Sequence, residues 1–153
     1  MDIRARLAAT GITLPPAAKA VANYVPVVVA GGMAIVSGQL PLVGGTLAAS
    51  GKLGDRVSIE EGTAAARACF INLLAQLDAH VEGGLDAVAR VVRLGGFIAA
   101  TASFTEHAKV MNGASDLAVE IFGEAGRHAR STIGVASLPL DAAVEVEGMF
   151  LLR

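Results

Sequence analysis

The chain has 153 residues, of which 54% are apolar and only 17% are charged, and its net charge is −2. This length predicts one domain, residues 1–153, with a sizeable core. Glycine or arginine interrupts every apolar run before it reaches the about 20 residues of a membrane-spanning helix. The sequence therefore excludes a membrane protein, and the excess of apolar residues predicts burial in a homo-oligomer.

Lysine and arginine are scattered, aromatic residues make up only 4% of the chain, and tryptophan is absent. Nucleic-acid binding usually needs clustered cations and, for single strands, stacking rings, so this composition argues against a nucleic-acid partner. The single cysteine, Cys69, excludes an intramolecular disulfide. The apolar stretch near Met1 is too short for a signal sequence, and we expect a cytoplasmic protein.

The first third of the chain predicts a short helix followed by a hairpin. Residues 3–10 favour the helix, and Pro15 and Pro16 favour an extended path after it. Two β-branched runs around Gly31-Gly32 predict a β-hairpin. The segment 45–55 is rich in glycine and serine and predicts a loop, and its glycine spacing matches no phosphate-binding motif.

A helix is predicted to begin after Ser58, because Ser58 and Glu61 have capping-box spacing, and to end near Val81. Gly83-Gly84 ends it. Its apolar positions share one face: Phe70, Leu73, Leu74, Leu77 and Val81. A long strand over 85–100 follows, in which Gly95-Gly96 indicates a bulge or a close backbone approach.

Ser103 and Glu106 suggest a second capping box, with a helix behind it that ends near Gly123. The apolar face of this helix comprises Val110, Ala114, Leu117, Ala118, Ile121 and Phe122. Two strands are predicted to follow, over about 131–137 and 142–152.

The resulting order is β-β-α-β-α-β-β, which predicts an α+β domain with one sheet and two helices on one of its faces. The strands carry valine, isoleucine and leucine on the other face too, and no third helix is left to cover it. We therefore expect partner subunits to cover that face.

Most candidate chemical groups have an ordinary structural interpretation. Cys69 lies beside Phe70 on a helix and is expected to be a buried thiol. The histidines share no metal-ligand spacing. We expect His80 and His107 at the surface, whereas His128 is close enough to Arg130 to line the same site. The sequence contains no recognisable metal or cofactor motif.

The C-terminal hairpin places charges in an apolar context. Because side chains alternate along a strand, Glu145 and Glu147 share one face, opposite Val144 and Val146. These glutamates could lie on a solvated face or line a cleft with Arg130, whose guanidinium group suits bidentate binding of a carboxylate. The residues alone leave both interpretations open.

Two segments carry a resemblance to a known family. They are "VSGQLPLVGG" (36–45) and "ARSTIGVASLPLDAAVEVEG" (129–148), the second with Arg-Ser, a short strand, Leu-Pro and a strand with two glutamates. Together with the order of elements, they resemble the RidA/YjgF family, also called L-PSP endoribonuclease-like, over nearly all of 20–153. Residues 1–19 would then be an N-terminal extension.

The resemblance implies a chorismate-mutase-like fold that assembles as a homotrimer, with the sheets packed into a central barrel. It also implies clefts between subunits that hydrolyse reactive 2-imino or enamino acids to 2-oxo acids and ammonia. The activity would be similar to that of a 2-iminobutanoate/2-iminopropanoate deaminase, acting on a small metabolite with a carboxylate group. The family chemistry uses no cofactor and no metal.

The resemblance also assigns roles to individual residues. Arg130 matches the arginine that binds the substrate carboxylate, and Glu145 matches the acid that positions or activates water. Further matches to the family's substrate-binding cleft are Tyr24, Ser37, Gly38, Asn112 and Thr132, the last of which stands where many members have cysteine.

The extension and the long segment between Asn112 and Arg130 indicate a divergent subgroup. Two other functions therefore remain open beside the deaminase. One is a non-catalytic protein that binds a small carboxylate in the same cleft. The other, which the acidic charge and the few aromatic residues disfavour, is the endoribonuclease or translation-inhibitor role attached to some relatives.

Overall fold

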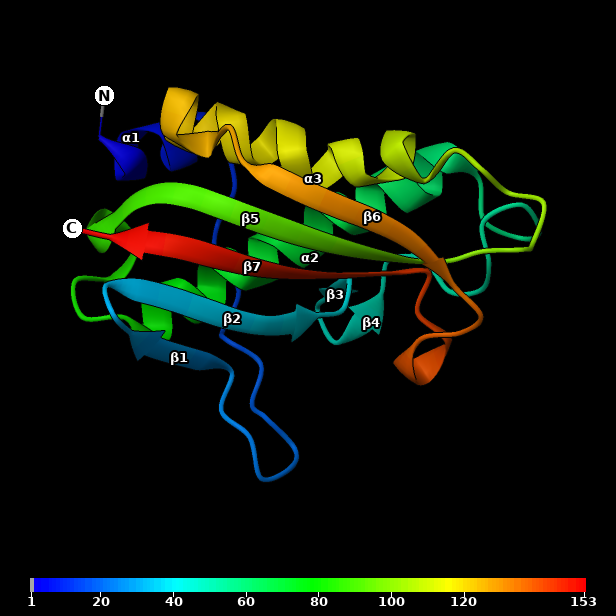
Figure 1. Ribbon diagram of the computed structural model, residues 1–153, viewed down its shortest axis with the longest axis horizontal. Coiled ribbons are helices and arrows are strands. Elements are labelled where there is room, and N and C mark those ends of the chain that lie inside the picture. Colours follow the sequence, from blue (N-terminus) through cyan, green and yellow to red (C-terminus); the bar gives the residue numbers. More distant parts are fainter. Residues whose placement is uncertain (1) are drawn as a thin grey trace.

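A computed structural model describes residues 2–153 and shows one mixed sheet in front of the long helices (Figure 1). The sheet has five strands. In sheet order they are β1 (Val27–Ala30), β2 (Met33–Gln39), β7 (Val144–Leu152), β5 (Val88–Ala99) and β6 (Ala129–Val135). Neighbours are antiparallel except for β5 and β6, which are parallel.

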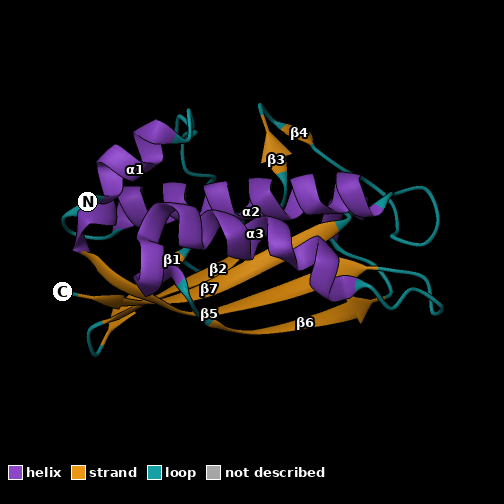
Figure 2. Ribbon diagram, turned by 90° about the horizontal axis from the view of Figure 1, so that it is seen from above, coloured by secondary structure: helices purple, strands orange, loops and turns teal. Residues whose placement is uncertain are grey.

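The helices all lie on one side of the sheet (Figure 2). They are α1 (Ile3–Ala9), α2 (Ile59–His80) and α3 (His107–Phe122). Three 3₁₀ turns lead into β5, β6 and β7: η1 (Gly84–Ala87), η2 (Gly123–Gly126) and η3 (Pro139–Asp141). This confirms the predicted α+β class and element order. The structure adds a small hairpin of β3 (Leu42–Val43) and β4 (Thr46–Leu47), whose second strand lies in the segment predicted as a loop.

The local signals explain most element boundaries. Gly31 and Gly32 both have positive φ, as a two-residue hairpin turn requires, and they join β1 to β2 as predicted. The Ser58–Glu61 capping box is confirmed. The Ser58 hydroxyl accepts a hydrogen bond from the Glu61 amide, and the Glu61 carboxylate accepts one from the Ser58 amide, both at 3.1 Å.

The predicted capping box at Ser103–Glu106 is wrong, because α3 begins only at His107. The Ser103 hydroxyl contacts the hydroxyl of Thr101 at 3.4 Å instead of capping the helix. The Glu106 carboxylate pairs with Lys109 rather than with a backbone amide.

The core lies between the sheet and helices α2 and α3. The predicted apolar faces of both helices are buried, which confirms the periodicity. Gly96 provides the expected close approach, because a Cβ there would lie 2.5 Å from the Sδ atom of Met111 on α3. The irregular pairings of β5 lie nearer its start, between Val88 and Arg93, so Gly95-Gly96 is not a bulge.

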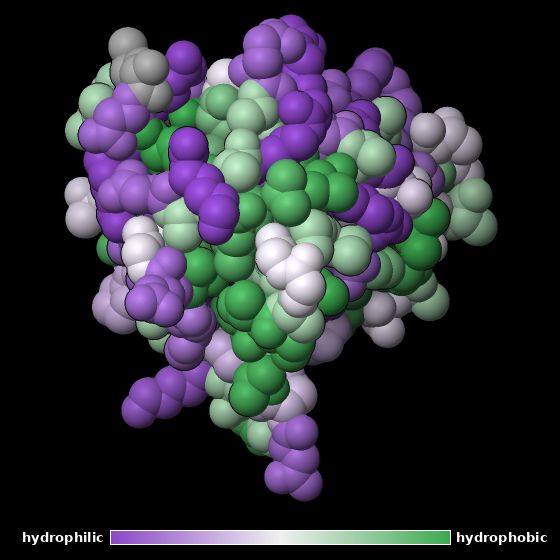
Figure 3. Space-filling view, turned by 60° about the vertical axis from the view of Figure 1, so that its left-hand side comes forward, coloured by the Kyte–Doolittle hydropathy of each residue, from purple (hydrophilic) through white to green (hydrophobic). Residues whose placement is uncertain are grey.

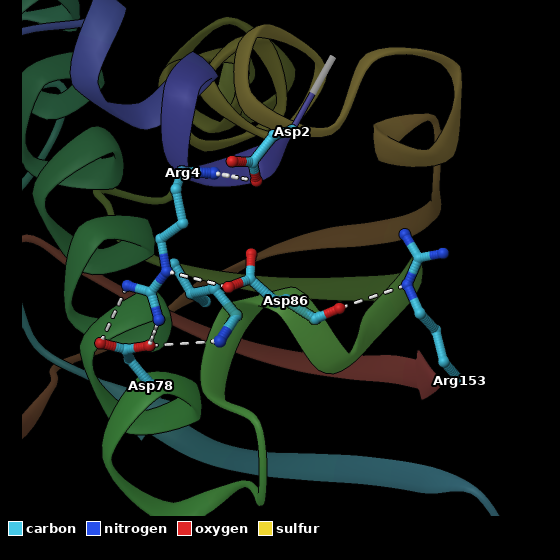
Figure 4. Close-up of polar contacts among 6 residues, drawn as sticks. Asp2, Arg4, Asp78, Asp86 and Arg153 are labelled. Carbon is cyan, nitrogen blue, oxygen red and sulfur yellow. Dashed lines mark hydrogen bonds and ion pairs between the residues drawn. The ribbon is translucent and has the colours of Figure 1, made fainter.

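Helix α1 is attached to the rest of the domain by Arg4 (Figure 4). Its guanidinium group forms ion pairs with Asp78 at the end of α2 and with Asp86 in η1. The Arg153 side chain donates a hydrogen bond to the Asp86 carbonyl at 3.2 Å. The Arg4 guanidinium lowers the pKa of Asp78. The predicted N-terminal helix is thus confirmed and packs onto the domain.

No element of the described chain covers the second face of the sheet. Apolar side chains remain exposed on it, among them Val28, Ile35, Ile133 and Leu151. In a view turned toward the end of the sheet where β7 finishes, apolar side chains form a band between polar flanks (Figure 3). We call the face of the sheet opposite the helices the open face. Within residues 2–153, no helix is both long and apolar enough to span a membrane.

Candidate functional site

The pairing of β6 and β7 with β5 shows on which face of the sheet each candidate charged residue lies. Arg130 pairs with Leu94, whose side chain is buried beneath the helices. Glu145 pairs with Phe97, which lies three residues after Leu94 on β5. Because side chains alternate along a strand, Phe97 and Glu145 point to the opposite, open face. Arg130 and Glu145 consequently lie on opposite faces, two strands apart, so one chain does not bring them together.

Arg130 is held against α3 by acceptors without charge. Its Nη1 donates to Asn112 Oδ1 at 2.9 Å and to Ser115 Oγ at 3.0 Å, and its Nη2 donates to the Ala108 carbonyl at 3.2 Å. Within residues 2–153, no ion pair involves Arg130. Thr132 lies on the same face of β6, so we define the Arg130 half-site as Asn112, Ser115, Arg130 and Thr132.

His128 continues this cluster. Its Nε2 lies 2.9 Å from Ser115 Oγ, and its Nδ1 lies 2.6 Å from the Gly126 carbonyl. Burial lowers the pKa of His128, the hydrogen bond to Gly126 partly opposes this, and the positive charge of Arg130 lowers the pKa further. Sequence reasoning missed Ser115. Its position three residues after Asn112, on the same side of a predicted helix, was an available signal.

The hydroxyl of Thr132 is buried and has no hydrogen-bond partner among the described residues. Thr132 pairs with Gly96 on β5, the position where Met111 packs closely against the sheet. An unsatisfied buried hydroxyl is uncommon in proteins. This hydroxyl therefore adds a polar group without a partner to the Arg130 half-site.

A second group of candidates gathers where β2 ends and β7 begins. A Cβ at Gly38 would clash with Oε1 of Glu145, so any other residue would force this carboxylate to move. The Ser37 hydroxyl donates a hydrogen bond to the Val25 carbonyl at 3.2 Å. Val25 directly follows Tyr24, so this bond brings Ser37 close to the Tyr24 segment. We call Tyr24, Ser37, Gly38 and Glu145 the Glu145 half-site.

The two glutamates of β7 have different surroundings. Glu147 forms an ion pair with Arg93 at 3.6 Å on the open face. Glu145 has no ion-pair partner among the described residues. Burial raises the pKa of Glu145, and the neighbouring charge of Glu147 raises it further. Glu145 is therefore a stronger base than an ordinary exposed carboxylate.

Two buried amides support the Glu145 half-site from behind. Gln39 Nε2 donates to the Ser37 carbonyl at 3.1 Å. Gln76 Nε2, on α2, donates to Gln39 Oε1 at 3.3 Å and to the Ala18 carbonyl at 2.7 Å. Helix α2, the Ser37-Gly38 part of β2 and the segment that leads to Tyr24 are thereby connected.

A cavity of about 590 Å³ lies beside this half-site and is lined mostly by apolar residues. Tyr24, Gly38, Gln39 and Gln76 contribute to its walls, together with Pro15 and other residues of the N-terminal segment. The Oε1 atom of Gln76 is buried without a partner in the described chain.

The other candidates are structural. Cys69 is fully buried, as predicted, and burial raises the pKa of its thiol well above the ordinary value. His80 is exposed, as expected. His107 is less exposed than predicted, because its ring packs edge-on against Phe104 with the centroids 5.2 Å apart. Within residues 2–153, no three His, Cys, Asp or Glu side chains form a possible metal site.

Comparison with known proteins gives full-length matches. The chain is 49% identical to Protein TCP17 of Trypanosoma cruzi, over 99% of this chain and 94% of that protein. A crystal structure of the protein Atu1372 with unknown function from Agrobacterium tumefaciens matches with 42% identity and a TM-score of 0.91, over 99% and 92% of the two chains.

A second crystal structure, of a "putative endoribonuclease" from Shewanella oneidensis, matches with 38% identity and a TM-score of 0.94, over 99% of this chain and all of that one. The family model described as YjgF/chorismate mutase-like, "putative endoribonuclease", matches residues 4–150. These matches cover nearly the whole fold and both half-sites. The chain belongs to the YjgF/chorismate mutase-like family.

Proposed function

We propose that this protein hydrolyses small 2-imino acids to 2-oxo acids and ammonia in clefts between the subunits of a homotrimer. The observation that carries the proposal is the pair of unneutralised charges, Arg130 and Glu145. Each is partly buried, and neither has an ion-pair partner among the described residues. A substrate with a carboxylate and an electrophilic imine carbon would use both.

The placement of the charges favours a cleft between copies. Because Arg130 and Glu145 lie on opposite faces of one sheet, a small substrate cannot contact both in the same chain. A neighbouring copy can supply the missing half-site. The apolar open face, where Ile35 and Ile133 are exposed, offers a surface for contact between subunits.

The hydrogen bonds of Arg130 leave the donors that a carboxylate needs. A guanidinium group has five N–H donors. Three are used by Asn112, Ser115 and Ala108, and these occupy Nη1 twice and Nη2 once. Nε–H and one Nη2–H remain, and with the Ala108 carbonyl on the outer Nη2 hydrogen they would form a side-on fork that matches the two oxygens of a carboxylate. Arg130 would thus bind and orient the substrate.

Glu145 would act as the general base. Its carboxylate takes a proton from a water molecule while the water oxygen bonds to the imine carbon. The carbon–nitrogen bond then breaks, ammonia leaves with the transferred protons, and the carbonyl of the 2-oxo acid forms. The raised pKa of Glu145 brings its basicity closer to the operating pH, which favours this role. Imine hydrolysis is facile in water, so positioning and one base are sufficient.

The test is a coupled assay in which an amino-acid oxidase generates the imine and its disappearance is followed by absorbance. The purified protein should accelerate the decay. Arg130→Ala and Glu145→Gln should each lose about 10²-fold or more. Arg67→Ala is the matched arginine control, because Arg67 pairs with Glu120 on the helix surface, and it should keep full activity. An uncatalysed decay rate with the wild-type protein would refute the proposal.

The same proteins distinguish the two alternatives. A non-catalytic carboxylate-binding protein would be stabilised thermally by a 2-oxo acid but would show no turnover, and only Arg130→Ala would abolish the shift. The family description and the Shewanella relative name an endoribonuclease. RNA cleavage that remains with the purified protein and disappears on Glu145→Gln would support that activity instead.

A further inference from the structure

The hydrogen bonds around Arg130 form a chain with a fixed direction. The Gly126 carbonyl can only accept, so Nδ1 of His128 must carry a proton at 2.6 Å from it. Ser115 Oγ already accepts from Arg130 Nη1 at 3.0 Å. Its own proton is therefore free to be donated to Nε2 of His128 at 2.9 Å. Arg130 donates to Ser115, Ser115 donates to His128, and His128 donates to Gly126.

This direction requires a neutral imidazole. A protonated His128 carries hydrogens on both ring nitrogens and cannot accept from Ser115. The Ser115 hydroxyl would then face two cationic donors, Arg130 and His128, and its own proton would have no acceptor. The second positive charge would also repel the Arg130 guanidinium. The contact between Arg130 and Ser115 should weaken as a result.

We propose that Ser115 and His128 are positioning residues for Arg130, and that the Arg130 half-site binds a carboxylate tightly only while His128 is neutral. This inference rests on the proposed function in one respect, the role of Arg130 in carboxylate binding. Neither residue touches the substrate in this scheme. They fix the guanidinium so that its free side-on fork keeps one orientation.

The surroundings of His128 fit this role. Strand β6 contributes Arg130, α3 contributes the uncharged Ser115, and η2 contributes the Gly126 carbonyl. No carboxylate within residues 2–153 forms an ion pair with His128. Because burial lowers its pKa, His128 is neutral at neutral pH and gains a proton only as the pH falls. Carboxylate binding should therefore be lost on the acid side.

The test uses the full-length protein and pyruvate, a 2-oxo acid whose carboxylate stays ionised between about pH 5 and 8. The dissociation constant is measured by calorimetry across this range for the wild type, Ser115→Ala and His128→Gln. Glutamine offers an acceptor for Ser115 that does not titrate. His80→Gln is the matched control, because His80 is exposed at the end of α2. The imidazole signals of the three histidines are followed by NMR in the same samples.

We expect Ser115→Ala to weaken pyruvate binding about fivefold at neutral pH, the effect of one hydrogen bond. Wild type and His80→Gln should lose affinity toward acid pH along the titration of the His128 signal. His128→Gln should bind at neutral pH like the wild type and lose the acid dependence. A protonated His128 also attracts the carboxylate, so the expected loss requires that the weakened Arg130–Ser115 contact outweighs this attraction. Protonation of Glu145 removes a negative charge and can only strengthen anion binding, so it cannot produce the same loss.

Two results would overturn the inference. One is an unchanged acid dependence in His128→Gln, and the other is wild-type affinity in Ser115→Ala. Both are measured without turnover, so they stand even if the protein does not hydrolyse imines. If Arg130→Ala also binds pyruvate like the wild type, the carboxylate role of Arg130 fails first, and the inference falls with it.

Discussion

The two half-sites hold their charges by different means. Arg130 is fixed by three hydrogen bonds to α3, which satisfy part of the guanidinium and leave one fork open. The Glu145 carboxylate has no hydrogen-bond partner among the described residues, and the absence of a side chain at Gly38 makes room for it. The cation is thereby preorganised for binding, while the carboxylate is left under-solvated and more basic. Under the proposed function, one small domain would provide an anchor and a base from opposite faces of its sheet.

The largest loss of activity should come from variants that each disable one of the two half-sites. Arg130→Ala and Glu145→Gln should each reduce imine hydrolysis by about 10²-fold or more. When the two variants are unfolded and refolded together in equal amounts, about one quarter of the clefts should combine an intact Arg130 from one chain with an intact Glu145 from the next. The rate of imine decay in the mixture measures this recovery.

The control for that experiment is each variant refolded alone, which should stay inactive. If the mixture remains as inactive as its components although native mass spectrometry shows mixed trimers, the charges do not act across subunits.

A smaller loss should follow from filling the space at Gly38. In Gly38→Ala the new methyl group clashes with Oε1 of Glu145 and displaces the carboxylate, and such a displacement can cost about 10- to 100-fold in kcat. KM should change little, because the Arg130 half-site is untouched. The double variant Gly38→Ala/Glu145→Gln should be no worse than Glu145→Gln alone. Additive losses in kcat would show that Gly38 acts through something other than Glu145.

The hydrogen bonds of the buried Gln76 amide should contribute more to the stability of the protein than to its activity. Gln76→Met keeps the size of the side chain but leaves the Ala18 carbonyl and Gln39 Oε1 without their donor. We expect a loss of about 1–3 kcal/mol in the free energy of unfolding, measured with urea. Arg67→Ala removes only an exposed pair and should lose less than about 1 kcal/mol. Equal losses in the two variants would argue against this connection.

The smallest change concerns the second glutamate. Glu147→Gln removes the charge that helps to raise the pKa of Glu145, so the pKa should fall and the acid limb of kcat should move to lower pH. The Glu147–Arg93 pair is partly exposed, and its loss should change the free energy of unfolding by no more than about 1 kcal/mol. A limb that moves to higher pH would contradict the assignment of Glu145 as the base.

Much of the fold follows from local signals in the sequence. The turn at Gly31-Gly32, the Ser58 cap and the spacing of Phe70, Leu73 and Leu74 each reflect contacts within one element, and all of these elements form as predicted. The cap at Ser103 fails because its hydroxyl finds Thr101 two residues earlier, a competing local bond.

The site was harder to predict, because it depends on pairing between distant strands. Alternation along β7 gives the relative faces of Glu145 and Glu147 but does not relate either to Arg130 on β6. That relation requires the register of β5, which pairs Arg130 with Leu94 and Glu145 with Phe97. Ser115 escaped notice because its partners, Arg130 and His128, are brought to α3 only by the tertiary fold.

The position of β7 has a consequence for synthesis in the cell. It follows every other strand in the chain, yet it lies at the centre of the sheet between β2 and β5. Before residues 144–152 leave the ribosome, the β1–β2 hairpin and the β5–β6 pair have no strand to join them. Domains whose early segments complete a core can fold as they emerge. This sheet can close only after translation of β7, and until then the facing edges of β2 and β5 stay unpaired.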